Sequence, residues 1–134
     1  MKKLFFILLL LAQPALADVV VITHPSGPDS MTQNQVRDLY IGRSKQLPDG
    51  HTADPIDLAS GHALRDEFHT TVTGRSQAQL NAFWSQQVFT GKGQPPRTLD
   101  TTTAVKTAVA STPGAIGYIT ADEVDDSVKV VLQP

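Results

Sequence analysis

The chain has 134 residues, with 13 acidic residues, 11 Lys or Arg and no cysteine. The slight negative charge argues against a general attraction for nucleic acid or anionic lipid. The lack of cysteine excludes disulfides, redox thiols and cysteine-zinc sites. No apolar run reaches the length of about 20 residues that a membrane-spanning helix needs.

Residues 1–17 have the three parts of a secretory signal peptide. Lys2 and Lys3 form a basic start, Leu4–Ala12 is an apolar run, and small residues precede a cleavage point after Ala17. We therefore expect an exported, periplasmic protein, with an uncleaved membrane anchor as the alternative. Cleavage leaves residues 18–134 as one domain with 9 basic and 13 acidic residues, because Lys2 and Lys3 are removed. A chain of this length is large enough to bury a hydrophobic core.

The first half of this domain alternates strands and helices. The β-branched run 18–23 predicts a buried strand, and the run 54–58 predicts a second one. Thr32 and Gln35 form a capping box, which predicts that a helix follows. The residues expected on the inner face of this helix are Val36, Leu39 and Tyr40.

Three more helices are predicted. The first follows the Ser60-Gly61 turn, has an apolar stripe and ends at Gly74; the stripe consists of Leu64, Phe68 and Val72. Ser76 caps the next helix, whose expected inward residues are Leu80, Phe83, Trp84 and Val88. The last contains the apolar residues of 105–109 and ends at Pro113-Gly114.

Short strands are predicted at 98–101, 115–119 and 128–132. The alternation of strands and helices is typical of an α/β domain, with a mostly parallel mixed sheet of about five strands and helices on both faces. The predicted core combines residues from two helices and a strand: Leu64, Phe68, Phe83, Trp84 and Ile116.

The junction between strand 54–58 and the next helix is the best candidate site, because ligands of open α/β sheets bind where strands end. The Ser60 hydroxyl, backbone amides at 61–63 and the Arg65 guanidinium are donors that suit phosphate or another oxyanion. The candidate anion-binding residues are Ser60, Gly61, His62 and Arg65. The alternative gives Ser60 only a capping role and pairs Arg65 with Asp57 or Asp66.

Neither a metal site nor an enzyme is predicted. His62 and His69 lie seven residues apart without a close histidine pair, so a solvated helix face explains them better than a metal does. The chain has no nucleophile elbow, zinc-protease motif or phosphate-binding P-loop. We expect no cofactor, and we expect Trp84, with Phe83 and Phe89, to belong to the core rather than to a stacking platform.

Three segments, 31–42, 89–96 and 112–118, together resemble the phosphate-type periplasmic substrate-binding proteins of ABC transporters, in the PBP-like superfamily. The resemblance covers about residues 19–120 and is closest to small secreted members with a single lobe. In the large members a Ser-Gly-Thr-Arg turn at a helix start binds phosphate. Ser60 and Gly61 match its first two positions, His62 stands in place of the threonine, and Arg65 lies two residues beyond the arginine position.

The resemblance implies a single-lobe PBP-like domain that binds phosphate or a similar oxyanion. Binding is expected to be weak, because water competes for the donors of an open half-site. The alternative function is a ligand-free interaction or sensory module that contacts a membrane or envelope protein. Loops 42–50 and 89–96 are the expected contact surfaces of such a module.

Overall fold

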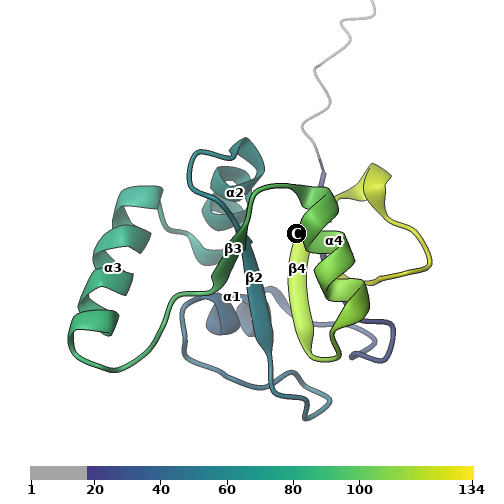
Figure 1. The fold of residues 1–134 in the computed structure, drawn as a ribbon, viewed down its shortest axis with the longest axis horizontal. Coiled ribbons are helices and arrows are strands. Elements are labelled where there is room, and N and C mark those ends of the chain that lie inside the picture. The colour runs from purple at the N-terminus through teal and green to yellow at the C-terminus, as the bar shows by residue number, and fades with distance from the viewer. Residues whose placement is uncertain (1–17) are drawn as a thin grey trace, which may run out of the picture.

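The computed structural model describes residues 18–134, which form a five-stranded sheet with helices around it (Figure 1). The predicted signal peptide, residues 1–17, lies outside the described residues. The strands are β1 (Val19–Thr23), β2 (Asp54–Leu58), β3 (Arg97–Leu99), β4 (Ala115–Thr120) and β5 (Lys129–Leu132). The helices are α1 (Gln33–Tyr40), α2 (Ala63–Phe68), the π-helix η1 (His69–Thr73), α3 (Gln77–Phe89), α4 (Thr102–Ser111) and the 3-10 turn η2 (Ala121–Glu123).

The sheet has the strand order β3-β2-β4-β1-β5. β2 pairs in parallel with β3 and β4, whereas β1 pairs antiparallel with β4 and β5. β5 therefore points the same way as β4, and β1 alone runs against the others. This arrangement confirms the predicted α/β class and the mixed, mostly parallel sheet.

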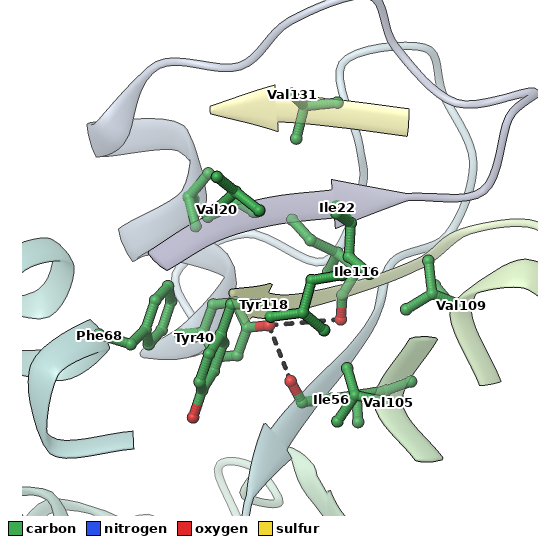
Figure 2. Packing of buried hydrophobic residues seen from close by; sticks show 14 of the residues in the cluster. Val20, Ile22, Tyr40, Ile56, Phe68, Val105, Val109, Ile116, Tyr118 and Val131 are labelled. Atoms are coloured by element: carbon green, nitrogen blue, oxygen red, sulfur yellow. Dashed lines mark hydrogen bonds between the residues drawn. The ribbon is translucent and has the colours of Figure 1, made fainter. Parts of the chain in front are cut away.

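Helices cover both faces of the sheet. A Cβ added at Gly117 would lie 2.6 Å from Cγ1 of Val105, so the lack of a side chain in β4 allows α4 to approach this face closely. Neighbouring residues of a strand point to opposite faces, and Tyr118 stacks on Phe68 of α2 with the ring centroids 3.9 Å apart. Figure 2 shows this packing, with hydrogen bonds from the Tyr40 hydroxyl to the carbonyls of Ile56 and Ile116.

The predicted capping signals are confirmed. The Gln35 amide donates to the Thr32 hydroxyl, and the Thr32 amide donates to the Gln35 side chain. The helix predicted after Ser60-Gly61 reaches Gly74 as expected, but its last five residues form the π-helix η1 rather than α-helix. Its whole apolar stripe is buried, namely Leu64, Phe68 and Val72.

The prediction for α3 is right in extent and wrong in packing. Ser76 caps the helix as expected, but Leu80 is its only buried residue, and Val88 and Phe89 are 47% and 92% exposed. Phe83 and Trp84 are only partly buried and do not join the core cluster, whereas Leu64, Phe68 and Ile116 do.

The cause is the position of the helix, which stands away from the sheet at one end of the molecule (Figure 1). Its aromatic side chains contact one another instead of the sheet. The rings of Phe83 and Trp84 pack edge to face with centroids 5.0 Å apart, and the Arg75 guanidinium lies 4.6 Å from the Phe83 centroid.

Candidate functional site

A groove of about 840 Å³ lies between α3, the end of β2 and the start of β3. From the sheet side and the turn after β2 it is lined by Asp57, Ser60, Arg65 and Arg97, among others. From α3 and the loop that follows, its apolar lining is Leu80, Trp84, Val88, Phe89, Pro95 and Pro96. Arg97 is paired with Asp54 at 3.1 Å, so the groove combines a polar side, with Arg65 as its unpaired cation within the described residues and Asp57 as a carboxylate, with an apolar side.

Arg65 is the buried cation of this groove, with only 8% of the residue exposed. Its Nη1 donates to the Leu58 carbonyl at 2.8 Å, but its buried Nε has no hydrogen-bond partner among residues 18–134. Within the same residues it forms no ion pair with Asp57 or Asp66, so the alternative expected from the sequence does not occur. A buried donor without a partner is costly; Nε is shielded from solvent, so an acceptor would reach it, and relieve that cost, only if neighbouring side chains moved.

The turn before α2 presents fewer free amides than the sequence suggested. The His62 amide donates to the Ala59 carbonyl at 3.2 Å. His62, not Ser60, caps α2, because its Nδ1 accepts the Leu64 amide at 3.2 Å. The ring proton of neutral His62 is therefore on Nε2. Ser60 and Gly61 are exposed, and neither the amide of Gly61 nor that of Ala63 is hydrogen-bonded within the described chain.

Gln77 is a second polar residue at this turn that the sequence did not single out. Its Nε2 donates to the Ser60 hydroxyl at 3.3 Å and to Asn81 Oδ1 at 2.9 Å, while its buried Oε1 has no partner. In residues 18–134, Arg65 Nε and Gln77 Oε1 are the buried side-chain polar atoms that lack a partner. Such atoms are uncommon in native proteins. Arg65 lines the groove, and Gln77 contacts Ser60, which also lines it.

A hydrogen-bonded network fixes the end of β2 at the groove, which Asp57 itself lines. The Asp57 carboxylate accepts from His69 Nε2 at 2.8 Å, from the Leu58 amide at 2.9 Å and from the Tyr118 hydroxyl. Burial, together with the neighbouring Asp57 charge, raises the pKa of Tyr118, so its hydroxyl stays protonated. Asp57 is thus held by three donors and positions the Leu58 carbonyl that anchors Arg65.

The network corrects the prediction for His69. Its side chain is buried, with 3% of the residue exposed, and is not part of a solvated face. Its Nδ1 lies 3.2 Å from the Thr73 hydroxyl within the π-helix, and its other nitrogen meets Asp57. The described residues contain no group of three or more histidine or acidic side chains that could hold a metal ion.

Trp84 is another correction, because it lines the groove instead of filling the core. A Cβ at Gly42 would lie 3.2 Å from its Cη2, and one at Gly93 would lie 3.7 Å from its Cζ3. Two glycines thus leave room for the indole beside the groove.

No protein-family model matches the chain, and no curated protein matches it. Several solved structures are similar to it. A putative phosphate ABC transporter substrate-binding protein from Clostridium perfringens, determined with bound phosphate, is 26% identical with a TM-score of 0.68. An ABC-type phosphate transport receptor from Vibrio cholerae is 17% identical (TM-score 0.66), and PstS from Borrelia burgdorferi is 12% identical (TM-score 0.64).

The chain has a PBP-like fold. Each alignment covers 85% of this chain but only 44%, 45% and 46% of the respective solved chains, so it spans less than half of their length. This share fits one lobe of the PBP-like fold and confirms the resemblance found in the sequence. The neighbours are named as binding proteins and receptors. No helix among residues 18–134 is long and apolar enough to cross a membrane.

Proposed function

We propose that this protein is a periplasmic PBP-like binding protein, without enzymatic activity, that binds phosphate or a similar oxyanion at Ser60, Gly61, His62 and Arg65. The observation that carries the proposal is the buried Nε of Arg65, which lacks a partner and belongs to a residue that lines the groove. The likeness to a protein with bound phosphate supports the choice of ligand.

One edge of the guanidinium has no partner within the described residues, although its Nε is shielded from solvent. Nη1 is used by the Leu58 carbonyl, but Nε and Nη2 form no hydrogen bond within the described residues. These two atoms form the side-on edge of arginine, which binds two oxygens of an anion in parallel. The Ser60 hydroxyl, the Gly61 amide and His62 Nε2 are the additional donors of the proposed site.

Binding should be weak, because Ser60 and Gly61 are exposed and water competes for their donors. We expect dissociation constants between about 1 μM and 1 mM, equivalent to roughly −8 to −4 kcal/mol. Periplasmic location rests on the signal-peptide pattern of residues 1–17. The mass of the protein from a periplasmic fraction tests it, and should correspond to a chain that begins at Asp18.

Calorimetric titration with phosphate, sulfate and acetate tests the binding proposal. Arg65→Gln should weaken phosphate binding by about tenfold or more, since a hydrogen bond to a charged group contributes about 1.5–3 kcal/mol. Arg43→Gln is the matched control, because it removes the same charge from an exposed position. No binding heat up to tens of millimolar, or equal affinities of the two variants, would contradict the proposal.

A second candidate function is an interaction module that contacts an envelope protein. Phe89 favours it, because it is 92% exposed at the end of α3 and the start of the predicted contact loop. A photo-crosslinking residue at position 89 should then form a discrete adduct with one envelope protein in intact cells. The same residue at exposed position 103 of α4 is the control and should form none.

A further inference from the structure

The groove is much larger than a bare oxyanion requires. Its volume is about 840 Å³. A water molecule occupies about 30 Å³ of liquid, so an ion with four oxygens occupies on the order of 100 Å³. Sites of about 300–1,000 Å³ are typical of organic ligands. An inorganic anion at Arg65 would leave most of the groove to water.

The space beyond Arg65 is bordered by apolar side chains. Trp84 and Val88 line it from α3, and Pro95 and Pro96 line it from the following loop. Val88 is 47% exposed, so it lines the groove without belonging to the buried core. α3 carries no charged residue along Gln77–Phe89, so its side of the groove offers no ionic partner.

We infer that the groove binds an oxyanion that carries an apolar group of about the size of an aromatic ring, such as an aryl or alkyl phosphate or sulfonate. The inference rests on the proposed function, because the anionic head is placed at the free edge of Arg65. The apolar body lies against Trp84, Val88 and the two prolines. Stacking and apolar burial then add affinity that inorganic phosphate does not have.

Trp84 provides a local probe, since it is the only tryptophan of the chain and lines the groove. We would titrate the protein with phenyl phosphate, inorganic phosphate and phenol, using calorimetry for affinity and Trp84 fluorescence for location. Phenyl phosphate should bind at least tenfold more tightly than inorganic phosphate and change the fluorescence saturably. Phenol should bind more weakly than phenyl phosphate by a similar factor.

The outcomes separate this inference from the function on which it rests. Equal affinities for phenyl phosphate and inorganic phosphate would overturn the inference and leave the oxyanion site intact. Binding of phenol as tight as that of phenyl phosphate would overturn the inference, because the anionic head would then add nothing to the affinity of the ring. Lack of binding by all three compounds would overturn both the inference and the proposed function.

Two variants locate the apolar part. Val88→Ser should weaken phenyl phosphate binding by about threefold or more and leave inorganic phosphate binding unchanged. Ala82→Ser is the matched control, because Ala82 is exposed on the same helix and does not line the groove. Trp84→Leu, measured by calorimetry, is a second test with the same expected pattern. Unchanged phenyl phosphate affinity in both groove variants would overturn the inference.

Discussion

The end of β2 and the helix α3 border the same groove but are built in opposite ways. Around β2, Asp57, His69 and Tyr118 are buried and hydrogen-bonded to one another or to backbone. On α3, a single residue is buried, and the helix ends in an exposed phenylalanine. We therefore expect the β2 side of the groove to contribute most of the stability and α3 to contribute little.

The largest expected contrast lies between two phenylalanines. Phe68→Ala removes a fully buried ring that stacks on Tyr118, and should lower the free energy of unfolding by about 3–5 kcal/mol. Phe89→Ala should change it by less than about 0.5 kcal/mol, as for other exposed positions. Urea unfolding measures both. Similar losses for the two variants would show that α3 is part of the stable core.

Tyr118→Phe should lower the free energy of unfolding by about 1–3 kcal/mol. The substitution deprives the buried Asp57 carboxylate of a donor, and hydrogen bonds to charged groups are the stronger ones. Tyr40→Phe is the control, because the Tyr40 hydroxyl donates to backbone carbonyls and not to a charge. If Tyr40→Phe costs more than Tyr118→Phe, the Asp57 network does not dominate this end of the sheet.

The capping boxes of α1 and α3 allow the same kind of substitution to be compared in the two regions. Thr32→Ala should cost about 1 kcal/mol of global stability, because α1 packs on the core with Val36, Leu39 and Tyr40. Ser76→Ala should reduce the helicity of α3 and the protection of its amides from hydrogen exchange, with a smaller effect on global unfolding. An equal global loss would mean that α3 unfolds together with the sheet.

Lowering the pH should reduce the stability of the sheet region and leave the local opening of α3 unchanged. Burial raises the pKa of Glu123, but hydrogen bonds from the Thr102 and Thr120 hydroxyls outweigh it and lower that pKa below its ordinary value of 4.5. A lowered folded-state pKa gives stability that is present above the ordinary value and is lost as the pH falls through the folded-state value. Glu123→Gln should therefore flatten the decline of stability below about pH 4.5 in urea titrations.

The same acid titration should leave local opening of α3 unchanged, because Gln77–Phe89 contains no ionisable side chain. Hydrogen exchange of α3 amides, corrected for intrinsic rates, measures this opening. If the protection of the α3 amides fell with pH in parallel with global stability, the two regions would not open independently.

The sequence predicted the elements well because caps and apolar spacing are local signals. Thr32, Ser76 and the stripe through Phe68 identified three helices with their correct starts or buried faces. The error at α3 has a clear cause. Periodic spacing of Leu80, Trp84 and Val88 shows that these side chains share a face, but it does not show whether another element covers that face.

The residues of the candidate groove were predicted in part for a similar reason, and their role in binding stays a prediction. Ser60 and Arg65 were found because they follow a strand and begin a helix, and both line the groove. The contact between Asp57 and His69 joins residues twelve positions apart through a π-helix, and no local pattern reports it. Asp57, which stands between Ile56 and Leu58 in β2, was a local signal of a buried polar network.

The most direct test of the account is the Arg65 Nε–H signal in a nitrogen–proton correlation spectrum, followed during a phosphate titration at constant ionic strength. The account predicts that this signal and the Gly61 amide shift along one saturable curve, and that chloride at equal ionic strength does not shift them. The signal would be assigned by its loss in Arg65→Gln. An Nε–H resonance that stays in place while phosphate reaches tens of millimolar would contradict the claim that Arg65 is the anion-binding residue of this groove.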